Sequence, residues 1–230
     1  MKNEFTGFPN STFKFLQELK KNNERPWFNE NKERYLNDVL EPSLRFIEAM
    51  DTRLKKLSPH FLAIAKRTGG SLMRIYRDTR FSKDKTPYKT NIGIHFRHEF
   101  GKDVHAPGYY MHVEPGRAYF GAGIWRPDRK TLTKIRTHIV EYERDWKRVS
   151  RSKKLTEAFE FSGESLKRPP RDFESDHPFI EDIKRKDFIA IAPLQFAILK
   201  TPAIIDEVCQ QIKASSHYIA FLCNALKIPS

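Results

Sequence analysis

The chain has 230 residues, of which 42 are Lys or Arg and 29 are Asp or Glu, so its formal net charge is +13 at pH 7. This length allows a sizeable hydrophobic core, and 39% apolar with 31% charged residues argues against disorder, collagen or a coiled coil. Apolar runs are too short for a spanning helix, and the N-terminus lacks the apolar stretch of a signal peptide. We therefore expect a cytoplasmic protein, not bound to membranes, that favours anionic partners.

Helical patterns occupy the chain from about residue 11 to residue 57. Asn10 or Ser11 can cap a first helix. Pro26 suits the first turn of a second helix, and Pro42 suits that of a third. The N-terminal part is therefore expected to be helical.

The apolar period changes to two between about residues 71 and 125, and eight of the ten glycines lie between positions 69 and 123. Alternation predicts strands around 72–76, 92–97, 109–114 and 117–125. Short connections such as Pro115-Gly116 make consecutive strands antiparallel neighbours.

Helical patterns return after Asp128, which can cap a long amphipathic helix ending near Val149. One more strand is expected at 188–192, and Thr201-Pro202 can open a final helix. We expect an α+β fold in which an antiparallel sheet, roughly 71–125, is flanked by N-terminal and C-terminal helices. The whole chain is expected to form a single domain, 1–230, helical over 11–57, β-rich over 71–125 and mainly helical over 128–227.

The final helix carries both cysteines, Cys209 and Cys223, which are 14 residues apart. At a rise of about 1.5 Å per residue they would lie roughly 20 Å apart, too far for a disulfide. Both are expected to be reduced packing residues.

Alternation also predicts which side chains lie opposite the core-facing side of the sheet: His95, Arg97, Tyr110, His112, Glu114, Tyr119 and Trp125. Gly93, Gly121 and Gly123 lie on the same face, and a strand glycine often marks the close approach of a ligand or another backbone. Two readings stay open at this point. Either helices cover both faces and these aromatics are core, or the second face meets a ligand.

His112 and Glu114 lie on one side of a strand, and His95 can join them from a neighbouring strand. Imidazole and carboxylate are metal-ligand types, but no recognised metal motif supports a metal site, and none is assigned. The same pair could act as acid and base, because a carboxylate can raise the pKa of a histidine. No cofactor follows from the sequence.

Positive charge is concentrated between residues 66 and 102, which hold ten basic residues against three acidic ones, so +7 of the net +13. Its densest part is residues 74–89, which we call the basic segment. Arginine binds phosphate or carboxylate oxygens two at a time, and lysine adds a point charge. Asp78 and Asp84 could each hold a basic side chain in one rotamer. The pattern favours an anion site.

The basic segment, Arg-Ile-Tyr-Arg-Asp-Thr-Arg-Phe-Ser-Lys-Asp-Lys-Thr-Pro-Tyr-Lys, resembles the signature of a bacterial and fungal family called domain of unknown function 2461. Further similarity lies in an opening motif that runs from Phe15-Leu16 through Asn22-Asn23, Arg25 and Trp27-Phe28 to Tyr35. It continues in the hairpin with Gly108-Tyr109-Tyr110 and Gly121-Ala122-Gly123-Ile124-Trp125, and in Leu166-Lys167-Arg168-Pro169-Pro170 with Asp176-His177-Pro178. Arg171-Asp172-Phe173 departs from the family pattern of a small residue and a tyrosine. The resemblance implies one unit but no activity, since the family has no assigned function.

Three functions are compatible with these patterns. The first is binding, with or without processing, of a phosphorylated or polyanionic ligand such as nucleic acid, through Arg74, Arg77, Arg80, Lys83, Lys85, Lys89, Tyr88, Tyr110 and Trp125. The second is an enzyme that acts on a small anionic metabolite, with Asp78, Asp84, His95, His112 and Glu114 as proton-transfer groups. The third is a structural or interaction module in which the basic segment is a salt-bridged network. The oligomeric state is not determined by the sequence.

A further expectation concerns the geometry of the anion site. Arg74, Arg77, Arg80, Lys85 and Lys89 should converge with Tyr110 and His112 around one concave region. Crowded cations repel one another, so we expect phosphate or sulfate to bind if three or more of the five lack a carboxylate partner.

Overall fold

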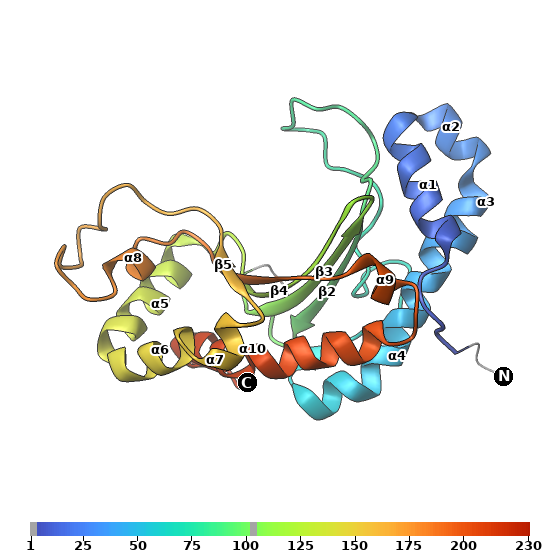
Figure 1. The fold of residues 1–230 in the computed structure, drawn as a ribbon. Helices are drawn as coiled ribbons and strands as arrows, with labels where there is room; N and C mark the ends of the chain where they lie inside the picture. Colours follow the sequence, from blue (N-terminus) through green and yellow to red (C-terminus); the bar gives the residue numbers. More distant parts are fainter. Residues whose placement is uncertain (1–3, 102–104) are drawn as a thin grey trace.

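The computed structural model describes residues 4–101 and 105–230. Within them, six strands form one antiparallel sheet in the order β1-β2-β3-β4-β6-β5, which confirms the α+β prediction (Figure 1). Three of the predicted strands form a consecutive meander. The strands are β1 (Phe61–Leu62), β2 (Ile92–His98), β3 (Gly108–Glu114), β4 (Arg117–Ile124), β5 (Glu160–Ser162) and β6 (Phe188–Pro193).

Helices precede and follow the meander, as the sequence predicts. On the N-terminal side lie α1 (Asn10–Lys21), α2 (Arg25–Glu30), α3 (Lys32–Arg34), the π-helix η1 (Tyr35–Leu40) and α4 (Glu41–Leu57). On the C-terminal side lie α5 (Arg129–Glu141), α6 (Glu143–Ser150), α7 (Lys153–Thr156), α8 (Ile180–Ile183), α9 (Phe196–Leu199) and α10 (Ile204–Leu226).

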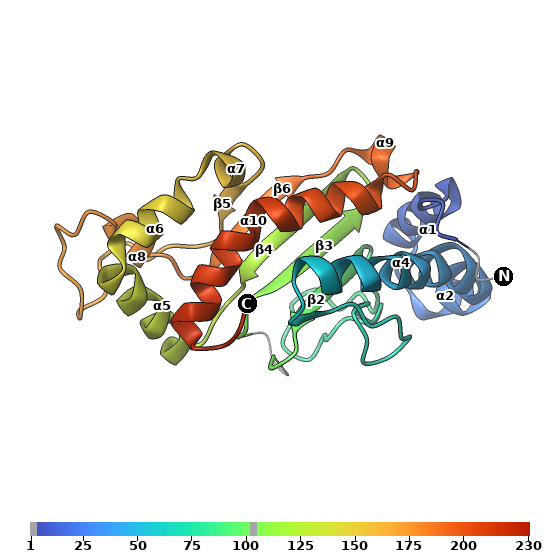
Figure 2. The same cartoon turned by 90° about the horizontal axis from the view of Figure 1, so that it is seen from below.

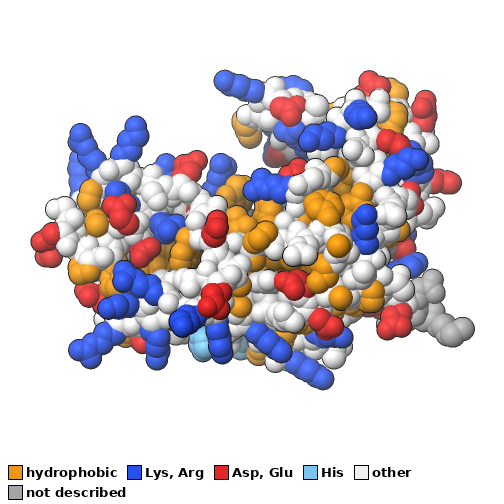
Figure 3. Space-filling view, viewed as in Figure 1, with side chains coloured by type: hydrophobic (Ala, Val, Ile, Leu, Met, Phe, Trp, Pro, Cys, Tyr) orange, Lys and Arg blue, Asp and Glu red, His pale blue; other side chains and the backbone are white. Residues whose placement is uncertain are grey.

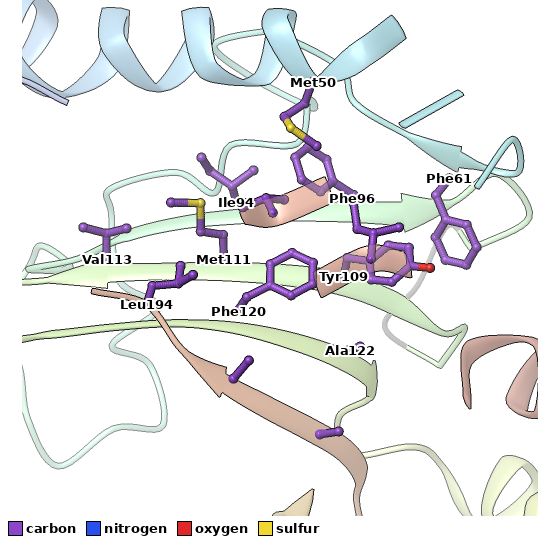
Figure 4. Close-up of a cluster of buried hydrophobic side chains, with 14 of the residues drawn as sticks. Met50, Phe61, Ile94, Phe96, Tyr109, Met111, Val113, Phe120, Ala122 and Leu194 are labelled. Carbon is purple, nitrogen blue, oxygen red and sulfur yellow. The ribbon is translucent and has the colours of Figure 1, made fainter. Parts of the chain in front are cut away.

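One face of the sheet forms the centre of the core. Alternate side chains of β2, β3 and β4 lie on it, and Figure 4 shows them with Met50 of α4. The long helices α4 and α10 cover this face (Figure 2). Each large apolar side chain buried here contributes about 1.5–3 kcal/mol. The buried positions include Ile94, Phe96, Tyr109, Met111, Val113 and Phe120.

Among the described residues no helix covers the opposite face (Figure 1). The basic segment rises at one side of it, and α5 and α8 with the segment 163–178 lie at the other. The reading in which helices cover both faces is therefore wrong. We call this surface the open face; by strand register it carries His95, Arg97, Tyr110, His112, Glu114, Tyr119, Ile189 and Ile191.

Two helix predictions need correction. The long helix after Asp128 is interrupted at Tyr142, which has a non-helical backbone, although Asp128 caps α5 as expected by accepting from the Thr131 N–H. The final helix begins at Ile204, because the Thr201 hydroxyl donates back to a carbonyl of the preceding turn instead of capping α10.

The N-terminal part holds further differences. The second predicted helix is divided into α2, α3 and η1. Pro9 is the N-cap of α1 and no side chain caps it, so neither Asn10 nor Ser11 does so. The expected strand at 72–76 is present only as isolated bridges, Leu72 to Ile94 and Tyr76 to Tyr88.

The sequence did not predict β1 or β5, because two or three residues are too few to show a period. Cys209 and Cys223 are both buried in α10 and unpaired. In the part of the chain that the structure describes, no helix combines the length and apolar character needed to cross a bilayer.

Candidate functional site

The basic segment forms an irregular hairpin that stands above the sheet (Figure 1). Its arms are joined by the bridge between Tyr76 and Tyr88 and by a hydrogen bond of 2.9 Å from the Arg77 N–H to the Pro87 carbonyl. Backbone hydrogen bonds therefore order the base of the segment.

The N-terminal helices fix this base in place. The side-chain amide of Asn23 donates to the Tyr88 carbonyl at 2.9 Å and accepts from the Tyr88 N–H at 3.0 Å, as a paired strand would. The ring of Phe28 on α2 stacks on that of Tyr88, with centroids 4.0 Å apart. Sequence reasoning gave Asn23 no role, and its place in the opening family motif was the only signal.

Both carboxylates of the basic segment pair with its arginines. Asp84 accepts from Arg77, which also donates to the Thr86 hydroxyl, and Asp78 accepts from Nε and Nη2 of Arg80 at 3.0 and 2.7 Å. The side chain of Arg80 holds the pKa of Asp78 at about 2. The backbone N–H of Thr86, followed by Arg77, holds the pKa of Asp84 at about 2. Arg77 and Arg80 are therefore each paired with a carboxylate that is ionised at neutral pH.

The other four cations of the basic segment have no carboxylate partner among the described residues. Lys85 donates to the Thr79 carbonyl and Lys89 to the Arg74 carbonyl, each at 2.9 Å. Burial, followed by the charge of Arg74, lowers the pKa of Lys89. The remaining cation is Lys83. Arg74, Lys85 and Lys89 thus meet the condition under which the sequence predicts a bound anion.

A cavity of about 690 Å³ lies between the basic segment and the turn from α1 to α2. Arg25, at the start of α2, has no hydrogen-bond or ion-pair partner among the described residues, and sequence reasoning did not select it as a site residue. The lining includes three cations (Arg25, Arg77, Lys85), one carboxylate (Glu24) and two phenol rings (Tyr76, Tyr88).

The expected convergence is only partial. Arg77 and Lys85 line this cavity, whereas Tyr110 and His112 belong to a separate cluster on the open face. The reason is that the two arms of the basic segment pair with each other and rise away from β2.

His112 is the centre of the cluster on the open face. Its Nδ1 lies 3.4 Å from Nδ2 of Asn91 and 3.1 Å from the hydroxyl of Tyr110, and its Nε2 lies 3.4 Å from Oε1 of Glu114. Because an amide nitrogen only donates, Nδ1 is the acceptor and the proton of the neutral ring lies on Nε2. Burial lowers the pKa of His112, and Glu114 only partly offsets this.

Tyr119 extends the cluster onto β4. Its ring is nearly parallel to that of His112, with centroids 4.7 Å apart and an interplanar angle of 8°. The guanidinium of Arg117 lies 5.0 Å from the Tyr119 centroid on the same strand. Figure 3 shows apolar side chains exposed in the hollow beside the basic segment, with Lys and Arg side chains along its edges.

Two glycines of the open face make room for rings. A Cβ at Gly108 would lie 2.4 Å from Nε2 of His95, and one at Gly93 would lie 2.8 Å from the hydroxyl of Tyr110. At these positions the close neighbour is a side chain, not the ligand or backbone that a strand glycine suggests. The rings of His95 and Tyr110 therefore lie across the adjacent strands instead of standing upright.

Three of the acid–base candidates, His95, Asp78 and Asp84, are poorly tuned for proton transfer at neutral pH. Burial, followed by the charge of Arg97, lowers the pKa of His95 to about 4, and its Nδ1 accepts from Nε of Arg97 at 3.2 Å. Asp78 and Asp84 are still farther from neutrality, with a pKa of about 2 each. Among the described residues no cluster of His, Cys, Asp or Glu is placed to hold a metal ion.

Two further aromatic residues are exposed. Trp125 follows β4, is 57% exposed and lies 4.8 Å from the guanidinium of Arg126. Phe81 lies in the basic segment and is 95% exposed, beside Arg80. Tyr88, in contrast, is buried although it lines the cavity.

Residues 11–221 match the model of a family described as Conserved hypothetical protein (DUF2461). The chain belongs to this family. The match spans both the basic segment and the open face, and it confirms the resemblance that the sequence motifs carry. The family description names no activity, and no curated protein and no solved structure matches the chain.

Proposed function

We propose that this protein binds a phosphorylated, polyanionic ligand such as nucleic acid through the basic segment. The observation that supports this most is the unbalanced charge of the segment. The segment contains six cations and only two carboxylates, and each carboxylate already pairs with an arginine. Arg25 adds a further unpaired cation beside it. A polyanion would relieve the repulsion among these groups.

The exposure of the cations favours a long ligand over a small metabolite. The side chain of Arg80 is 76% exposed, and Lys83 is also exposed. General acid–base catalysis works best with a pKa near the operating pH, and three of the five acid–base candidates, His95, Asp78 and Asp84, have a pKa of about 4 or about 2. The enzyme reading therefore has less support.

The ion pairs of Arg77 and Arg80 support part of the third hypothesis, in which the basic segment is a salt-bridged structural network. They hold the segment in shape, and they leave four of its cations without a carboxylate partner among the described residues. We include a cytoplasmic location in the proposal, because two unpaired buried cysteines suit a reducing compartment.

The test is binding of a labelled random-sequence DNA and RNA pool, measured by fluorescence anisotropy over a range of salt concentrations. Affinity should fall steeply with salt, with a logarithmic slope that loses about 0.7 for each phosphate contact removed from a single strand. Arg25→Ala, Arg74→Ala and Lys83→Ala should each weaken binding and flatten that slope.

Lys213→Ala is the matched control, because Lys213 is an exposed lysine of α10, on the other side of the sheet. It should bind as the wild type does. Absence of binding, or an affinity that salt does not weaken, would contradict the proposal.

A further inference from the structure

The open face leaves aromatic and apolar side chains partly exposed to solvent. Across β3 and β4 it presents the rings of Tyr110, His112 and Tyr119, and β6 adds Ile189 and Ile191. The corresponding residues of the core face, one position away along each strand, are fully buried under α4 and α10. An aromatic and apolar floor without a helix over it is suited to binding flat, apolar groups.

We call the surface formed by the rings of His95, Tyr110, His112 and Tyr119 the platform, and two of these rings lie low over neighbouring strands. Tyr110 lies over Gly93, and His95 lies over Gly108, because neither glycine has a Cβ to hold the ring away from the strand. The rings of His112 and Tyr119 lie face to face across β3 and β4, so one face of each is covered by the other ring and only its other face or its edge can meet a ligand. Four strands at a spacing of about 4.8 Å make the open face roughly 14 Å wide.

Positive charge lies mainly along the edges of the platform, and the guanidinium of Arg117 also lies over the ring of Tyr119. Arg97 projects from β2 and Arg117 from the start of β4, and the basic segment rises along one side. Glu114 is a carboxylate on the same face, and it lies against His112. A ligand that fits this surface needs anionic groups at its edge and flat faces at its centre.

We propose that the open face binds unpaired bases of a single-stranded nucleic acid whose phosphates contact the basic segment. This inference rests on the proposed function and adds the strandedness of the ligand and the site of its bases. In a duplex the base faces are hidden, so only a single strand can use the rings and the cations together. Sheet surfaces with aromatic rings stack two or three bases in known RNA-binding modules.

The test compares a labelled oligo(dT) of about 20 nucleotides with a DNA duplex of the same length. The wild type should bind oligo(dT) at least about tenfold more tightly than the duplex. Loss of one stacking ring, in Tyr110→Leu or Tyr119→Leu, should weaken oligo(dT) binding about 5- to 150-fold and leave duplex binding unchanged. Tyr142→Leu is the control, because Tyr142 is an exposed tyrosine between α5 and α6, away from the sheet.

A second measurement needs no variant and so does not depend on folding of the substituted proteins. The same oligonucleotide carrying 4-thiothymidine, irradiated on the wild-type protein, should crosslink to peptides of β3 and β4. Crosslinks confined to the basic segment would overturn the inference.

The outcomes separate the two proposals. Equal binding of oligo(dT) and duplex, weakened by Arg74→Ala but not by Tyr119→Leu, would overturn the single-strand inference and leave polyanion binding standing. If neither nucleic acid binds the wild type, both proposals fail.

Discussion

His112 and Tyr119 face each other across β3 and β4 with their rings almost parallel, 4.7 Å apart between centroids. The two residues are a directly opposed pair in the register, so the strand geometry itself sets this stack. It holds the imidazole in one plane, with Nδ1 toward Asn91 and Tyr110 and Nε2 toward Glu114. The histidine is thus a fixed part of the open face.

We expect His112 to be neutral at pH 7, with its proton on Nε2, because burial lowers its pKa. In Glu114→Gln the pKa should fall further, since the carboxylate charge now raises it. Nitrogen and proton NMR of the imidazole across a pH titration measures both properties. A proton on Nδ1, or a pKa that rises in Glu114→Gln, would contradict the geometry.

His95 should make folding stability depend on pH. Its folded pKa of about 4 lies below the ordinary value near 6.5, so between these pH values the unfolded chain binds more protons than the folded protein. The free energy of unfolding should therefore fall by about 2–3 kcal/mol from this residue as the pH drops from about 6.5 to about 4.

Urea denaturation at several pH values, for the wild type and His95→Gln, measures this contribution. The variant keeps a neutral polar side chain, so its stability should depend less on pH in that window. An unchanged pH dependence would show that His95 titrates normally in the folded state.

Asp187 precedes β6 and links it by hydrogen bonds to the residues that follow β4 and β5. It is buried, and its two oxygens accept from the backbone N–H of Arg126 at 2.7 Å and of Glu164 at 3.0 Å. Asp187→Ala leaves two donors without a partner and should cost about 2–4 kcal/mol. Asp187→Asn keeps one acceptor and should cost about half as much. Chemical denaturation separates the two variants, and equal losses would mean that the hydrogen bonds are not the cause.

Replacing two glycines of β4 by alanine should affect stability to very different extents. Gly123 has φ +131°, and a Cβ there would lie 1.9 Å from the Phe188 carbonyl oxygen, so Gly123→Ala should destabilise by about 3 kcal/mol or more. At Gly121 the nearest atom would be 3.7 Å away, and Gly121→Ala should change stability by less than about 1 kcal/mol. Thermal melting of both variants measures the two stability losses. Losses of similar size would contradict the prediction.

Inorganic phosphate should stabilise the folded protein more than chloride at matched ionic strength, because the unpaired cations favour a specific oxyanion. The gain in melting temperature should be smaller in Arg25→Ala, which removes a cation from the cavity without breaking an ion pair. Lys213→Ala serves as the control. Equal gains in melting temperature in the wild type and Arg25→Ala would show that phosphate acts through general surface charge and not through a specific site at Arg25.

The sequence by itself determined the meander of β2, β3 and β4 and the side chains of each face. A strand repeats every two residues whatever surrounds it, so alternation alone places His95, Tyr110 and Tyr119 on one side. The charge excess of the basic segment and its family resemblance were likewise readable, since both depend only on the order of residues.

Tertiary structure alone decided how distant segments combine. Asn23 binds Tyr88 from 65 positions away, and β6 inserts between β4 and β5, contacts for which no local period exists. Nor does alternation tell whether a second face is covered, because covering depends on where helices far along the chain dock. Here α4 and α10 both pack on the same side, which leaves Tyr110 and His112 on the open face.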